Sequence, residues 1–202
     1  MTIANYTELQ TAVGRWLQRT DMGTMIPDFI AIAEADFNRL FRLSGQLTRE
    51  TLTVSQRWTA LSGLANTFLE IRTVKITAGG ASYALEFVAP EMTHDFYVAG
   101  KPKFYTIAGG EIGVFPSPDG SYDLEVEYYA ALPPLASNST NWLLSLAPDV
   151  YLYRAVMEGA QYTHNPELMA RVEAMFMKAA ATLKQSDVSK QFGGSALAIR
   201  GD

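Results

Sequence analysis

The hydrophobic period of the chain changes twice along its length, and this feature constrains the fold more than any other. Apolar residues recur three and four positions apart within residues 9–41, at alternate positions through much of residues 46–128, and three and four apart again within residues 148–183. The first spacing is that of an amphipathic helix, and the second is that of a strand with one buried face. The sequence therefore predicts two helices, then a sheet, then two further helices, which is an α+β fold.

Helix start signals support this division. Asn5 and Glu8 have the spacing of a capping box at the start of the first helix, and the second helix is expected over residues 26–41. Pro148 opens the third helix. Residues 165–167 start the fourth with an N-cap side chain, a proline in the first turn and a carboxylate near the positive helix end. The most economical packing brings the two terminal helix pairs together as a bundle.

The middle region has turn signals between its alternating stretches. Gly79-Gly80 and Gly109-Gly110 each separate two such stretches, as expected for hairpins. In the last stretch Asp123, Glu125 and Glu127 alternate with apolar residues, which predicts a strand with an acidic, solvated face. The region is therefore expected to form an antiparallel β meander, inserted into the helical bundle as a lobe.

These elements divide the chain into four segments. The bundle receives its helices from both ends of the chain, the lobe lies between them, and an extended arm follows the last helix. The expected segments are the N-terminal helices at residues 1–45, the β lobe at 46–132, the C-terminal helices at 133–185 and the arm at 186–202.

The C-terminal arm is predicted because the helical period fails beyond Ser186 although apolar residues continue. An arm bearing Phe192, Leu197 and Ile199 makes too few contacts to fold alone. These three residues are therefore candidate contacts with a groove on a neighbouring subunit or another partner.

The composition argues against several classes of function. Lys and Arg number 16 against 21 Asp and Glu, a net charge of -5, and the basic residues are scattered. This disfavours tight nucleic-acid binding and leaves only passive contact with DNA. The absence of cysteine excludes disulfides and thiolate metal sites and fits a reducing cytosol. Neither a secretion signal nor a spanning helix is expected.

No set of catalytic, cofactor-binding or metal-ligating residues is predicted. His94 and His164 do not have the spacing of metal ligands. Residues 109–113 lack the P-loop lysine and no helix follows them, so a hairpin turn is expected there and not a phosphate loop. The acidic residues of the last strand lack EF-hand spacing. The chain is therefore expected to be no enzyme and to need no cofactor.

Several segments resemble the phage adaptor family, the head-to-tail connectors of short-tailed phages of the tail tubular protein A type. They follow one another in order over nearly the whole chain. They are Ile26-Pro27-Asp28-Phe29-Ile30, Thr67-Phe68-Leu69-Glu70-Ile71-Arg72, Gly100-Lys101-Pro102-Lys103-Phe104-Tyr105-Thr106-Ile107, Pro116-Ser117-Pro118-Asp119-Gly120 and Pro148-Asp149-Val150-Tyr151-Leu152-Tyr153, together with residues 33–35, 124–129 and 141–144.

The resemblance implies a structural protein of the virion neck or tail, assembled in the host cytoplasm. It implies a ring of twelve copies between the portal protein and the tail nozzle protein, with the arm engaging the portal and the β lobe facing the nozzle. The ring would form part of the DNA ejection conduit, where an acidic strand face opposes binding of phosphate. Two alternatives stay open, namely another neck or head-completion protein and a tail-associated hydrolase.

Overall fold

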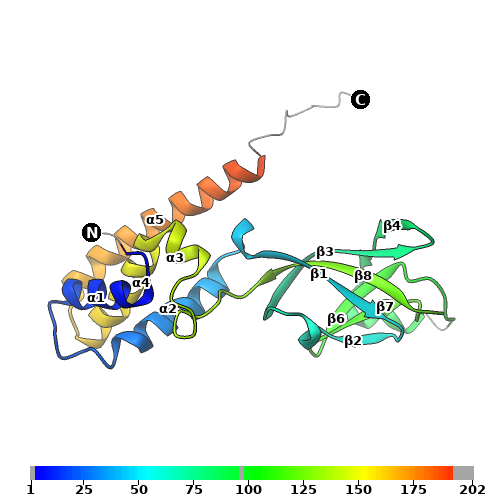
Figure 1. Ribbon diagram of the computed structural model, residues 1–202, viewed down its shortest axis with the longest axis horizontal. Helices are drawn as coiled ribbons and strands as arrows, with labels where there is room; N and C mark the ends of the chain where they lie inside the picture. Colours follow the sequence, from blue (N-terminus) through cyan, green and yellow to red (C-terminus); the bar gives the residue numbers. More distant parts are fainter. Residues whose placement is uncertain (1–2, 96–97, 193–202) are drawn as a thin grey trace. The chain divides into compact units, whose positions relative to one another are not determined.

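The computed structural model describes residues 3–95 and 98–192 and divides the chain into two compact units (Figure 1). The helical unit consists of the chain up to Gly45 and from Leu132 onward, and the β unit consists of residues 46–131. Every strand lies in the β unit and every α-helix lies in the helical unit. The α+β class is therefore confirmed for the described residues.

The helical unit is built around one central helix. This helix, α4, packs against all four other α-helices of the unit, and its buried residues belong to the unit's single hydrophobic core. The helices are α1 (Tyr6–Leu17), α2 (Ile26–Leu40), α3 (Trp142–Leu146), α4 (Pro148–Tyr162) and α5 (Pro166–Phe192).

Contacts between helices from the two ends of the chain hold this bundle together. The ring of Phe37 in α2 meets the ring of Tyr151 in α4 edge to face, with 4.9 Å between centroids. On α4, a Cβ atom at Gly159 would lie 2.5 Å from Cδ1 of Leu17, so the glycine allows α1 to approach closely. The expected bundle of N-terminal and C-terminal helices is confirmed.

Side-chain caps start the helices where the sequence predicted them. Asn5 Oδ1 accepts from the N–H of Glu8 at 3.0 Å, while Glu8 Oε2 accepts from Ala4 N–H at 2.7 Å, one residue before the position of the usual capping box. Asn165 Oδ1 accepts from Leu168 N–H at 3.0 Å and caps α5. These signals are local in sequence, which is why they could be recognised.

The β unit contains two four-stranded sheets that share one core. Sheet A has the order β1-β8-β3-β4 and sheet B has the order β2-β7-β6-β5. The buried side chains of this core include Ile76, Ile112, Val114, Leu124 and Val126. The strands are β1 (Leu47–Val54), β2 (Trp58–Ala60), β3 (Phe68–Ala78), β4 (Ala81–Ala84), β5 (Glu86–Phe87), β6 (Phe104–Ala108), β7 (Glu111–Phe115) and β8 (Tyr122–Ala130).

The strand order differs from that of a single meander. Both expected hairpins are present, and Gly79, Gly80, Gly109 and Gly110 all have positive φ angles. However, β8 lies between β1 and β3, and β5 pairs with β6 in parallel. The period of a strand indicates which face is buried but not which distant strand is its neighbour, so the sequence alone did not predict this pairing.

The last helix is longer than expected. α5 continues to Phe192, so residues 186–192 are helical and are not the start of an extended arm. The hydrophobic period fails here because a buried polar residue, Asp187, takes an inward position. Leu197 and Ile199 lie outside the described residues, and Phe192 is the final residue of α5.

Candidate functional site

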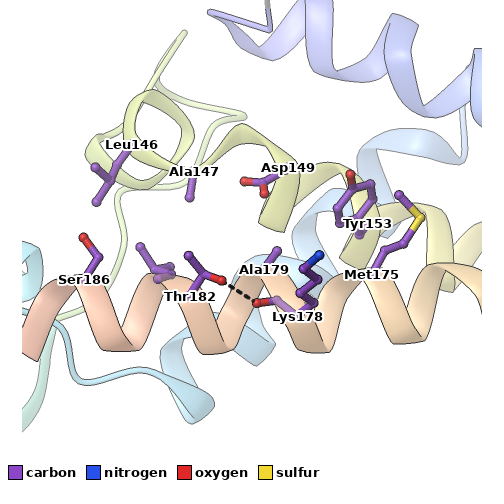
Figure 2. Close-up of a pocket in the computed structure, with 10 residues that line it drawn as sticks. Leu146, Ala147, Asp149, Tyr153, Met175, Lys178, Ala179, Thr182 and Ser186 are labelled. Carbon is purple, nitrogen blue, oxygen red and sulfur yellow. Dashed lines mark hydrogen bonds between the residues drawn. The ribbon is translucent and has the colours of Figure 1, made fainter.

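A groove in the helical unit lies between α5 and the segment where α3 meets α4, and we call it the α3–α5 groove (Figure 2). Its volume is about 510 Å³. Ala147 ends α3 and also precedes the first residue of α4, so the chain bends at this point and leaves a gap beside α5. The wall on this side consists of Leu146, Ala147, Asp149 and Tyr153.

The opposite wall is one face of α5. Its residues recur three and four positions apart over three turns, as one side of a helix requires. Leu183 is buried at the base of this wall, whereas Leu146 across the groove is 50% exposed. The residues of the α5 wall are Met175, Lys178, Ala179, Thr182, Leu183 and Ser186.

The groove is apolar along its base and carries one charge of each sign. Asp149 projects from the first turn of α4, and Lys178 projects from α5 toward the same gap (Figure 2). Neither side chain forms an ion pair with another residue in the described ranges. The groove therefore combines an apolar base with one acidic and one basic side chain.

A second feature, the junction cluster, consists of Ser44, Asp187 and Gln191. The Asp187 carboxylate accepts from Ser44 N–H at 3.0 and 3.1 Å, from the Ser44 hydroxyl, and from Gln191 Nε2 at 2.9 Å. Ser44 begins a short 3₁₀ helix, Ser44–Gln46, that contains the boundary between the two units. The cluster thus fixes the end of α5 to Ser44. The chain leaves the helical unit directly after the next residue, Gly45.

A third feature fixes the segment by which the chain returns to the helical unit. Glu34 Oε1 accepts from Leu135 N–H at 2.8 Å and from the Tyr151 hydroxyl at 3.3 Å. Asn141 Nδ2 donates to the Tyr151 oxygen at 2.6 Å and to Pro133 O at 2.9 Å. This network joins α2, α4 and the returning segment, so the buried polar groups position a stretch that has no regular structure.

Burial shifts the pKa values of Glu34 and Tyr151 in this network. It raises the pKa of Glu34, and the hydrogen bonds from Leu135 and Tyr151 act in the opposite direction. Burial also raises the pKa of Tyr151. Glu34 binds the backbone N–H of Leu135, and Tyr151 joins the Glu34 and Asn141 side chains, so these groups are hydrogen-bonded within their own unit.

The predicted acidic residues lie on the outer face of sheet A, beside cations from both neighbouring strands. Glu125 Oε1 lies 3.6 Å from Arg49 Nε and 3.8 Å from Lys75 Nζ, and Glu127 Oε1 lies 3.7 Å from Arg49 Nη2. Asp123 Oδ1 accepts from Thr53 Oγ1 at 3.3 Å. The structure brings the three carboxylates to one face and partly balances their charge, which the alternating pattern of one strand did not reveal.

The two histidines belong to different units. His164 is exposed at the end of α4, where its φ angle of 52° places it in the left-handed region, and His94 belongs to a 3₁₀ helix in the β unit. The described residues contain no group of three or more His, Asp or Glu side chains that could hold a metal ion. Within the same ranges, no helix is both long and apolar enough to cross a bilayer.

Comparison with known families decides the class of protein. A family model described as SU10 adaptor protein matches residues 4–199. The chain belongs to the SU10 adaptor protein family. The resemblance to phage head-to-tail adaptors is thereby confirmed at the level of the family. A structural role in the virion follows in general terms. A search of curated proteins found no match.

Membership of the SU10 adaptor family gives the features above a context. An adaptor acts through surfaces that bind other proteins, so the α3–α5 groove and the outer face of sheet A are the candidate sites. The sequence pattern missed the groove because it depends on α3 and on the bend at Ala147. The one available signal was the Asn141 N-cap, whose side chain accepts from Leu144 N–H at 2.9 Å.

Proposed function

We propose that this SU10 adaptor protein forms a ring of twelve copies between the portal protein and the tail nozzle protein of a short-tailed phage. The observation that carries the proposal is the family match over residues 4–199. The two-unit architecture supports it, because two separate cores give one chain two bodies with which to meet two different partners. The ring is assembled in the host cytoplasm and lies in the virion neck.

The part of the chain proposed to engage the portal is residues 193–202, together with Phe192 at the end of α5. Leu197 and Ile199 in this segment are apolar and alternate with small residues. A short segment of this kind binds by laying alternate side chains into pockets of a partner. The arm proposed here therefore begins after α5, later than the helical period of the sequence indicated.

The proposed role of the protein is mechanical and not enzymatic. The buried polar groups with the most evident networks, Glu34, Tyr151 and Asp187, bind backbone groups and side chains of their own chain. The role of these buried groups in stabilising the fold is sufficient to explain their presence.

We propose that the outer face of sheet A tolerates DNA without retaining it. Asp123, Glu125 and Glu127 outnumber their cationic neighbours Arg49 and Lys75, so the face keeps a negative excess that opposes phosphate binding. Fluorescence anisotropy with labelled duplex DNA tests this directly. We expect no retention at physiological salt, and measurable binding there would contradict the proposal.

The central experiment mixes the purified protein with portal rings and compares its particle mass with that of a portal-free control. A defined cyclic complex that forms with the portal supports the adaptor role. A protein that stays unbound with the portal contradicts portal binding and turns the assignment toward another neck protein.

A matched pair of variants locates the portal contact. Leu197→Ser with Ile199→Ser should weaken portal binding by roughly tenfold or more, because burial of each side chain is worth about 1.5–3 kcal/mol. Ala196→Ser with Ala198→Ser changes the alternate positions of the same segment and should leave the affinity within about threefold, since little apolar area is removed. Equal losses for both pairs would contradict a specific contact through Leu197 and Ile199.

A further inference from the structure

We propose that the α3–α5 groove is a docking site for residues 197–202 of the same chain. The groove would then hold the arm on its own subunit in the free protein. This goes beyond the proposed function, because the docking involves one chain only and requires no portal. Reach and apolar character support it independently.

The groove lies within reach of the segment that follows α5. α5 ends at Phe192, and the groove extends along this helix from Ser186 back to Met175. At a rise of about 1.5 Å per residue, these two positions lie roughly 9 Å and 26 Å before the helix end. Eight residues after Gly194 span about 26 Å when extended at about 3.3 Å each. A segment that turns back after α5 therefore covers the whole groove with residues 197–202.

The residues needed for the turn stand at the right place. Gly193-Gly194 follows the last residue of α5 directly. Glycine after a helix end accepts the left-handed conformation that reverses the chain at little cost. Because the segment after the turn runs back along α5, Leu197 comes level with the Ser186 end of the groove and Ile199 comes level with Thr182.

The apolar side chains of the segment match the base of the groove. In an extended segment Leu197 and Ile199 project to the same side, because they are two residues apart. The base opposite them is formed by Leu183 and Ala147, and Leu146 is half exposed beside them. Docking would also cover the exposed half of Leu146.

The charges of the segment do not by themselves select this register. Arg200 follows Ile199 and comes level with the part of the groove that contains Asp149. Asp202 lies two residues further, at roughly 26 Å, and comes level with Met175, whereas Lys178 lies roughly 21 Å before the helix end and is level with Arg200. Asp149 and Lys178 have no ion-pair partner among the described residues, so an arginine at this level meets one attractive and one repulsive charge.

We assign the groove to the chain's own segment and not to the segment of a second copy. The reason is that the tethered segment has the higher local concentration at the groove. A segment tethered beside its site has an effective concentration of about 1 mM. A second copy in a dilute preparation offers its segment at a concentration far below this value. The difference supplies the means of distinguishing the two cases.

Disulfide trapping in the full-length chain tests the proposal, because the protein has no cysteine of its own. The test variant carries Thr182→Cys in the groove together with Ile199→Cys. The control variant carries Ala181→Cys with the same Ile199→Cys; Ala181 is exposed at the same level of α5 and does not line the groove. Both proteins are oxidised mildly at low concentration, and the intramolecular disulfide is measured by mass spectrometry.

We expect the intramolecular disulfide to form at least about tenfold faster in the groove pair than in the control pair, because docking raises the local concentration on one face only. Equal rates would overturn docking in the groove. Disulfide-linked dimers as the main product at low concentration would overturn docking within one chain and would assign the groove to a second copy. Since no portal is present, failure here leaves the portal-mixing result unaffected.

Discussion

The carboxylate of Asp187 accepts a hydrogen bond from the backbone N–H of Ser44, with 3.1 Å to one carboxylate oxygen and 3.0 Å to the other. The two residues are 143 positions apart in the sequence. The Ser44 hydroxyl donates to the same carboxylate. Because Asp187 belongs to the last turns of α5, this contact makes the end of the helix part of the folded helical unit.

Replacing Asp187 should therefore destabilise the helical unit. We expect Asp187→Ala to lower the free energy of unfolding by about 1–3 kcal/mol, because the N–H of Ser44 loses its acceptor in a partly buried position. Urea denaturation followed by circular dichroism measures the change.

The matched control is Glu173→Ala, which removes an exposed carboxylate from the same helix. It should change the free energy of unfolding by less than about 0.5 kcal/mol. If both substitutions lower the free energy of unfolding by the same small amount, the contact between Asp187 and Ser44 does not contribute to stability.

The neighbouring glycine, Gly45, should not tolerate a side chain. A Cβ atom at this position would lie 2.6 Å from Cε3 of Trp142, the first residue of α3. We expect Gly45→Ala to cost about 1–3 kcal/mol of folding free energy, because an indole ring in a packed helical unit cannot move aside freely. Thermal unfolding by differential scanning calorimetry measures the loss.

Gly23→Ala is the control for this substitution, since a Cβ atom there would meet no atom within 4 Å. Its unfolding temperature should stay near that of the parent or rise slightly, because alanine reduces the entropy of the unfolded chain. A loss at Gly23 as large as that at Gly45 would mean that the close contact with Trp142 is not the cause.

The parts of the fold that the sequence could predict are those encoded by near neighbours. The N-cap at Asn5, the hairpin at Gly109-Gly110 and the face of α2 each depend on residues a few positions apart. The position of β8 between β1 and β3 depends on pairings such as Thr51 with Glu125, which lie far apart in sequence. A period of two is compatible with any neighbour, so it could not supply this order.

The sequence indicated which residues of the candidate sites are polar or charged, but not which partners surround them. The alternating acids of β8 indicated a polar outer face, yet Arg49 and Lys75 reach it from other strands and change its charge. The failure of the period after Ser186 indicated the end of a helix, whereas Asp187 is a buried polar residue with a distant partner. Both errors have one cause, because a hydrophobic pattern cannot show which polar groups are satisfied across the fold.

The buried carboxyl group of Glu34 should give stability a specific dependence on pH. Burial raises its pKa above the ordinary value of 4.5. As the pH rises, the unfolded chain loses this proton first, and the folded chain keeps it until the pH passes the raised value. The contribution of Glu34 to stability is therefore full below pH 4.5 and is lost as the pH rises through the pKa of the folded state.

Glu34→Gln isolates this contribution. The amide oxygen can still accept from Leu135 and Tyr151, but the side chain no longer ionises. We expect the stability of the variant relative to the parent to increase between about pH 4 and pH 7.5, as measured by urea denaturation at both values. A difference between the two proteins that is the same at both pH values would contradict the raised pKa. All other acidic residues are common to both proteins, so their contributions cancel in the difference between the two free energies of unfolding.

Sheet B contains a buried hydroxyl group that has no hydrogen-bond partner among the described residues. Thr106 lies in β6 opposite Gly113 of β7, and its Oγ1 atom is buried without a hydrogen-bond partner in the described part of the chain. Next to it, the Trp58 ring lies so close to Gly113 that a Cβ atom there would be 2.6 Å from Cζ3. The hydroxyl thus sits in a packed and apolar part of the sheet.

Thr106→Val should stabilise the β unit by about 1 kcal/mol, because it replaces an unsatisfied hydroxyl with a methyl group of the same shape and keeps the β-branched side chain that a strand favours. Thr51→Val makes the same change at an exposed position of β1 and should alter the free energy of unfolding by less than about 0.5 kcal/mol. Chemical denaturation of both variants decides the matter. A loss of stability in Thr106→Val would mean that the hydroxyl is hydrogen-bonded in solution, as it would be to an ordered water inside sheet B.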